Sequence, residues 1–255
     1  MKKKFLKIGA FVLAIILTFG LGYIVNGLLG NVVSEFLAKK SAKEYIAKEY
    51  KGTDYYIEGV FYDMKAAGYS AEVVSPSSED SYFTLTINMT GKVLYDTYDY
   101  CVKQKGNTAY RVSSEYEERI DEVFDESEFS FKYSYVNSEL DHDLIKDDLE
   151  LDKKYDIDKL GKKAGHITVS IIDKKQTTKK AAEYMLEIKE VLKKSDVSFY
   201  SIDISINYSE NYDEVNSKND IYIRDFLYKN IKEKGLEKRI KQSIKESQKD
   251  DKKDL

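Results

Sequence analysis

The chain has 255 residues, with 41 Lys or Arg, 45 Asp or Glu and a formal net charge of −4. This length allows one large domain or two small ones. The single cysteine excludes an intramolecular disulfide and cysteine-based zinc sites, and two histidines leave little room for a His-rich metal site. The negative net charge argues against a general nucleic-acid binder.

The first segment is an apolar run that holds no charged residue from Ile8 to Val33. A run of this length can cross a hydrocarbon core of about 30 Å as a helix. A cleaved signal peptide would have a shorter run and a small-residue cleavage site, and a lipoprotein signal would need a cysteine at its end. The only cysteine is Cys101. We therefore expect residues 1–33 to form an uncleaved transmembrane signal anchor.

The lysines before this run predict its orientation, since basic residues favour the cytoplasmic side. They are Lys2, Lys3, Lys4 and Lys7. We expect a single-pass protein of the cell membrane with a cytoplasmic N-terminus and extracytoplasmic domains. Without residues 1–33 the chain carries 37 basic and 45 acidic groups, so that part is acidic and polar. The abundance of Lys, Ile, Asn and Tyr is typical of an AT-rich, Gram-positive bacterial source.

The first expected module, residues 34–125, begins with a helix over 34–50 that ends before Gly52. Alternating apolar and polar residues then predict four strands, over residues 55–64, 69–74, 82–89 and 93–102. Connections this short favour antiparallel pairing. A second helix, over 113–124, is expected to close the module. The predicted order is helix, four-strand meander, helix.

The second expected module covers residues 126–246. Alternation predicts strands over residues 129–136, 167–171 and 200–208, and helical spacing predicts a helix over 177–194. The strand–helix–strand unit is long enough for a parallel crossover, so this module is expected to be α+β with a mixed sheet. A last amphipathic helix carries Leu236, Ile240 and Ile244, and residues 247–255 are expected to be a disordered tail.

One acidic cluster suggests a metal site. Asp141, His142 and Asp143 are followed by further acids at Asp147, Asp148, Glu150 and Asp152. Carboxylate oxygens and one imidazole could bind calcium or a transition metal. The glycine and terminal glutamate of a calcium loop are absent. We favour a solvated acidic loop, because blocks of charge usually lie in solvent.

The other reactive side chains stand outside known catalytic motifs. His166 begins a strand, where a structural role is more common than a catalytic one, and Cys101 is expected to be a buried, inert thiol. No Gly-x-Ser-x-Gly elbow and no glycine-rich phosphate loop occur. We therefore assign no catalytic, cofactor-binding or metal-binding residue. A pair of catalytic carboxylates on different strands would escape this reading, because spacing in sequence does not reveal it.

Tyrosines crowd the first module, at positions 55, 56, 62, 69, 82, 95, 98, 100 and 110. Tyrosine combines apolar area with one polar tip and can serve a binding surface. A tyrosine-rich meander is also what a sheet requires. Both interpretations stay open.

Two segments resemble a known family. AKEYIAKEYKGTDYYIEGVFYDMKAAGYSAEVVSPSSEDSYFTL resembles the start of the YfjL-like proteins, which are membrane-anchored, uncharacterised proteins of Bacillus and Clostridium relatives. GHITVSIID and VLKKSDVSFYSIDISINY look like the C-terminal module of that family. The resemblance implies two extracytoplasmic modules and supplies no activity or functional residue. The helix-then-meander order is also similar to cystatin-like and PepSY-type modules, which generally bind or inhibit.

Three functional hypotheses follow. The first is a membrane-anchored extracytoplasmic protein with a non-catalytic binding role, which contacts the membrane through its N-terminal helix and binds an envelope or membrane protein, without a cofactor or nucleic acid. The second is a cell-envelope hydrolase that uses carboxylates. The third is a structural subunit that assembles through the membrane helix.

Overall fold

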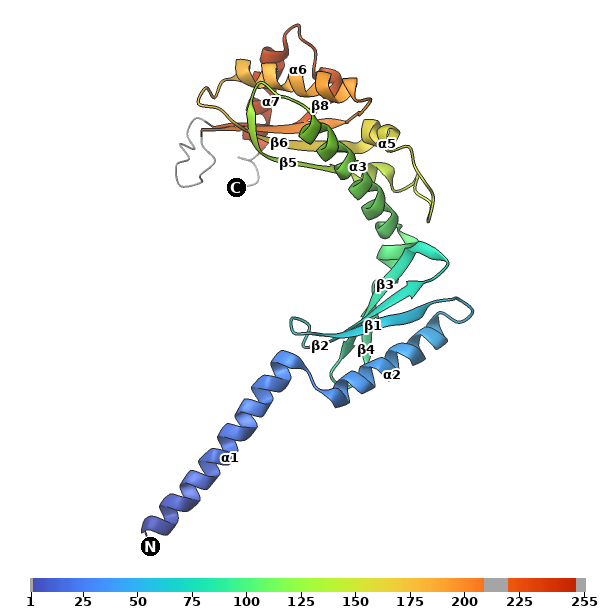
Figure 1. The fold of residues 1–255 in the computed structure, drawn as a ribbon, viewed down its shortest axis with the longest axis vertical. Coiled ribbons are helices and arrows are strands. Elements are labelled where there is room, and N and C mark those ends of the chain that lie inside the picture. Colours follow the sequence, from blue (N-terminus) through green and yellow to red (C-terminus); the bar gives the residue numbers. More distant parts are fainter. Residues whose placement is uncertain (1, 209–219, 251–255) are drawn as a thin grey trace. The chain divides into compact units, whose positions relative to one another are not determined.

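The computed structural model describes residues 2–208 and 220–250 and divides into two compact units, Met1–Asn107 and Thr108–Leu255 (Figure 1). Each unit contains one four-stranded sheet, so the predicted α+β class with two sheets is confirmed. The division lies earlier in the chain than the boundary that we expected after residue 125. The reason is that the helix expected to close the first module contributes its apolar side chains to the second core.

The sheet of the first unit is the antiparallel meander that the short connections predict. Its strands, in hydrogen-bonded order, are β1 (Tyr56–Asp63), β2 (Gly68–Ser75), β3 (Ser78–Asn88) and β4 (Val93–Asp96). Phe83, Leu85 and Ile87 are buried at every second position of β3, because side chains alternate between the faces of a strand. Helix α2 (Val32–Glu49) covers the buried face with Ala38, Ala42 and Ile46 (Figure 1).

The fourth strand is shorter than predicted. It ends at Asp96, and residues Asp99–Lys103 form a short π-helical turn, η1. The carboxylate of Asp96 accepts a hydrogen bond from the backbone N–H of Tyr98 at 3.0 Å. This local bond turns the chain out of the sheet, since an aspartate that bonds the backbone two residues on favours a turn.

The apolar run near the N-terminus is divided between two helices. Helix α1 runs from Lys2 to Leu29, Gly30 has a left-handed φ of +69°, and Asn31 caps α2 by accepting a hydrogen bond from the N–H of Ser34 at 2.8 Å. A side chain at position 30 would meet Tyr62 and Tyr69 within 2.9 Å, so glycine is required there.

The predicted transmembrane helix at residues 1–33 is therefore wrong. Within residues 2–208 and 220–250, none of the helices combines the length and the apolar character needed to span a bilayer. The charge-free run is not one helix, and α1 also contains the four lysines at its start. The cytoplasmic N-terminus and the extracytoplasmic placement of the remaining chain stay predictions.

The second unit contains a mixed sheet. Its strands, in hydrogen-bonded order, are β5 (Lys132–Leu140), β6 (Gly165–Ile172), β7 (Ser201–Asn207) and β8 (Ile221–Leu227). The β6–β7 pair is parallel and the other pairs are antiparallel. Helix α6 (Thr178–Lys194) connects β6 to β7, which confirms the predicted parallel crossover.

The described part of this unit also contains four more helices and one short turn. They are α3 (Gly106–Glu126), α4 (His142–Ile145), α5 (Ile157–Ala164), the 3-10 turn η3 (Tyr228–Asn230) and α7 (Leu236–Asp250). Helices α3, α6 and α7 bury apolar side chains with the isoleucines of β6 and β7 in one core. The core therefore lies on one face of the sheet. Residues 209–219 and the last five residues of the predicted tail lie outside the described residues, and α7 includes the tail's first four residues.

Candidate functional site on the open face of the second sheet

The two faces of the second sheet differ sharply in polarity. On β6, Ile167, Val169 and Ile171 point into the core, and the residues between them point to the other face. The same alternation on β7 buries Ile202, Ile204 and Ile206. The residues of the opposite face, which we call the open face, are His166, Thr168 and Ser170 on β6 and Ser201, Asp203, Ser205 and Asn207 on β7.

The open face is bound together by side-chain hydrogen bonds. Ser170 and Ser205 are paired across the parallel strands, and their Oγ atoms lie 3.1 Å apart. The side-chain amide of Asn207 donates to the Oγ of Ser170 at 2.8 Å. These bonds hold short polar side chains in fixed positions on a rigid sheet, while the face stays accessible because most of its side chains are only half-buried.

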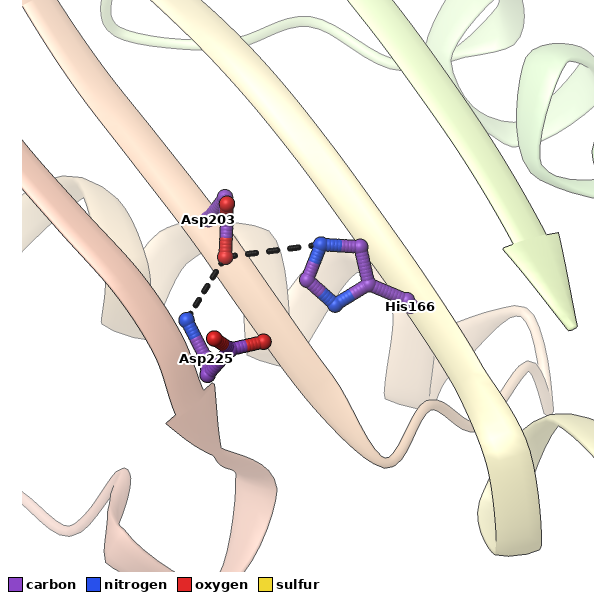
Figure 2. A group of neighbouring side chains, drawn as sticks. All are labelled: His166, Asp203 and Asp225. Carbon is purple, nitrogen blue, oxygen red and sulfur yellow. Dashed lines mark hydrogen bonds and ion pairs between the residues drawn. The ribbon is translucent and has the colours of Figure 1, made fainter. Parts of the chain in front are cut away.

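His166 is the centre of a cluster at one end of this face (Figure 2). The parallel register places it opposite Ser201, whose Oγ lies 2.8 Å from the Nδ1 atom of the imidazole. The Nε2 atom lies 3.4 Å from an oxygen of Asp203. The carboxylate of Asp203 raises the pKa of His166 above its ordinary value, although burial opposes this shift. The charges of Asp225 and Glu139 raise it further.

A β-bulge brings Asp225 to the cluster. Ile202 pairs with Phe226 and Ile204 pairs with Ile223, so Asp203 faces two residues of β8. Asp225 has a left-handed φ of +51°, which aspartate tolerates better than most residues. Its backbone N–H donates to Asp203 at 2.7 Å, as Figure 2 shows. Ligand atoms of His166, Asp203 and Asp225 thereby lie within 4.8 Å of one another.

The cluster borders a hollow of about 440 Å³ at the ends of β5 to β8. Its lining includes His142, His166, Tyr200 and Asp225. The Nε2 atom of His142 is buried and has no hydrogen-bond partner among the described residues. A buried polar atom without a partner is unusual in a folded protein.

The structure disperses the acidic cluster that the sequence singled out. Asp141 is the N-cap of α4 and accepts a hydrogen bond from the N–H of Asp143 at 2.9 Å. Asp143, Asp148 and Glu150 form ion pairs with lysines at 2.8, 2.5 and 2.5 Å. These acids are balanced by neighbouring lysines, and of the triplet 141–143 Asp141 and His142 line the hollow.

The cysteine and the tyrosines have mostly structural surroundings. Cys101 is half-buried rather than buried, and its Sγ lies 3.4 Å from the hydroxyl of Thr97. Several of the tyrosines in the first unit pack against one another and against Phe83; they are Tyr45, Tyr50, Tyr55 and Tyr98. Tyr56, Tyr95 and Tyr100 of the same unit stay exposed, as does Tyr110 on α3.

Sequence reasoning noted His166 but missed its partners. A usable signal existed for Asp203, because the predicted parallel crossover and the alternation of residues 200–208 place it on the polar face beside His166. No comparable signal existed for Asp225. The bulge that turns it toward Asp203 depends on how β8 pairs with β7.

Comparisons with known proteins add a family and no activity. The YfjL-like N-terminal domain matches residues 2–97, and the YfjL-like C-terminal domain matches residues 115–241. No curated protein and no solved structure matches the chain.

Proposed function

We propose that this chain, which belongs to the YfjL-like family and carries both of its domains, is a non-catalytic binding protein. The open face of the C-terminal sheet is the surface that we assign to a protein partner. One observation carries this proposal: a cross-strand row of two serines flanked by two exposed tyrosines.

The register of the sheet supports the row directly. Tyr135 of β5 pairs with Ser170, Ser170 pairs with Ser205, and Ser205 pairs with Tyr222 of β8. Residues paired across neighbouring strands point to the same face. Tyr135 is 54% exposed and Tyr222 is 51% exposed. Tyrosine provides rigid contact area at low entropic cost, and serine provides adaptable hydrogen bonding, which is the composition of many protein-binding surfaces.

The hydrolase alternative has weaker support. Ser201 lies within hydrogen-bond distance of His166, but it is only 6% exposed, which leaves little access for a substrate. A general acid needs burial to stay protonated near neutral pH. Asp225 is exposed and the side chain of Asp203 is 29% exposed. An acyl-transfer site also needs free N–H groups for the oxyanion, whereas β7 uses its backbone to pair with a strand on each side.

Site-specific photocrosslinking tests the binding surface. A benzophenone amino acid at position 205 of the full chain, produced in its own host cells, should give a discrete crosslinked protein adduct. The same group at Glu190, an exposed position on α6, is the matched control and should give none. The double substitution Tyr135→Ala with Tyr222→Ala should reduce the adduct severalfold. Equal labelling from both positions, or no adduct from position 205, would contradict the proposal.

A further inference from the structure

We infer that His166, Asp203 and Asp225 bind a divalent transition-metal ion of the zinc class on the open face. This inference deepens the proposed function and rests on it, because the ion would lie on the surface that we assign to the protein partner. The ion itself can be measured without any partner.

The donor set has the composition of a transition-metal site. One imidazole nitrogen and two carboxylates match the ligands that Zn²⁺ and similar ions take from proteins. Calcium and magnesium prefer six or more oxygen donors, so an imidazole argues against them. When the imidazole is deprotonated, as a metal-binding histidine must be, the two aspartates provide the double negative charge that balances a dication. The three ligand atoms come from three adjacent strands and lie within 4.8 Å of one another.

The separation of His166 and Asp203 matches that of two ligands of one metal ion. Their N and O atoms are 3.4 Å apart, beyond the usual hydrogen-bond range of 2.7–3.2 Å. Two atoms that each bind one zinc ion at about 2.0–2.1 Å with tetrahedral angles lie about 3.3 Å apart. The pair is therefore already spaced as two ligands of one ion.

Neighbouring groups hold these ligands in place. The Nδ1 atom of His166 contacts the hydroxyl of Ser201, which leaves Nε2 as the atom that faces Asp203. The N–H of Asp225 donates to Asp203 and orients that carboxylate. Metal-binding side chains in proteins are commonly fixed by such outer contacts. Figure 2 shows the three side chains on one side of the sheet.

A separate observation points to a ligand in the same hollow. His142 lines the hollow with His166 and Asp225, and its buried Nε2 atom lacks a hydrogen-bond partner among the described residues. Such an atom calls for a bound water or ion. Three protein ligands leave a fourth position on zinc, which water or a donor from the partner could occupy.

Metal titration of the tag-free full chain tests the inference. Co²⁺ should bind at one equivalent with visible absorption bands, Zn²⁺ should displace it, and Ca²⁺ should not. Asp203→Asn and Asp225→Asn should each weaken Zn²⁺ binding at least about tenfold. Glu183→Gln, which removes an exposed acid on α6, is the control and should leave binding unchanged. Far-ultraviolet circular dichroism confirms that each variant folds.

Saturable Zn²⁺ binding that both asparagine variants retain, or no saturable binding below about 1 mM, would overturn the metal site. Crosslinking from position 205, repeated with a chelator and in Asp225→Asn, separates the two proposals. A crosslinked adduct in a chain that binds no metal would reject only the metal site. Metal binding by a chain that gives no adduct would reject only the partner surface.

Discussion

At the scale of single residues, Asp96 shows how one carboxylate organises the first unit. It accepts hydrogen bonds from the hydroxyls of Tyr45 at 2.6 Å and Tyr50 at 2.9 Å, and from the N–H of Tyr98. The hydrogen bond to Asp96, followed by burial and the negative charges of Asp96 and Glu49, raises the pKa of Tyr45 to about 12. Burial, followed by the hydrogen bond to Asp96, also raises the pKa of Tyr50.

This shift predicts a loss of stability in alkali. The ordinary pKa of tyrosine is about 10, so at pH 11 the unfolded chain has lost the proton of Tyr45 and the folded chain keeps it. The free energy of unfolding must therefore fall as pH rises from about 10 through 12. Tyr45→Phe should flatten this fall in denaturant titrations at pH 9, 10, 11 and 11.5. Tyr56→Phe, at an exposed position, is the control. An unchanged slope in Tyr45→Phe would contradict the assignment.

At the scale of elements, the junction of α5 and β6 depends on two glycines. Gly161 and Gly165 lie against the buried ring of Tyr116 on α3, whose hydroxyl donates to the carbonyl of Ser198 at 3.1 Å. A Cβ at position 165 would lie 2.4 Å from that hydroxyl and 2.6 Å from the carbonyl of Gly161. The close approach lets β6 begin at Gly165, directly after α5, with His166 as its second residue.

Gly165→Ala should therefore destabilise the second unit by about 1–3 kcal/mol, the usual range for overpacking. The change should lower the midpoint of thermal unfolding by several degrees. Gly22→Ala is the matched control, because a Cβ there meets no atom within 4 Å and α1 is helical around it. Alanine in a helix interior is favoured over glycine by about 1 kcal/mol. If the thermal unfolding midpoint of Gly165→Ala is at or above that of Gly22→Ala, the junction has room for a methyl group and this prediction is wrong.

At the scale of the whole molecule, the two units have separate hydrophobic cores. Leu85 and its neighbours form one cluster, and Ile188 belongs to the other. Among the described residues, the two clusters share no member. Each core therefore has its own free energy of packing, and the domain matches of the YfjL-like family follow the same two-part organisation.

Separate cores predict independent responses to core substitutions. Leu85→Ala and Ile188→Ala should each cost about 2–5 kcal/mol, because each leaves a cavity at a fully buried position. In the double variant the two costs should add within about 0.5 kcal/mol, and each should move a different transition in a denaturant titration. Glu190→Ala, at an exposed site, is the control. A single transition that both substitutions move together would argue for one cooperative unit.

Much of this architecture could be predicted, and the candidate site could not. The alternation around Leu85 and Ile204 predicted strands that the structure contains, and the length of the connection through α6 predicted the parallel pair. The acidic run at 141–152 drew attention as a metal candidate because its residues are close in sequence. The cluster that forms is His166 with Asp203 and Asp225, which are far apart in the chain.

The sequence by itself determined local features. They are the alternation of apolar and polar residues in the strands, the helix limits near Gly52 and Thr177, and the family that the chain resembles. Tertiary structure decided the rest. It divided the apolar run at Gly30, where two tyrosine rings leave no room for a side chain, and it placed α3 in the second core. It also built the His166 cluster, because a bulge and a cross-strand register arise only when strands distant in sequence pair.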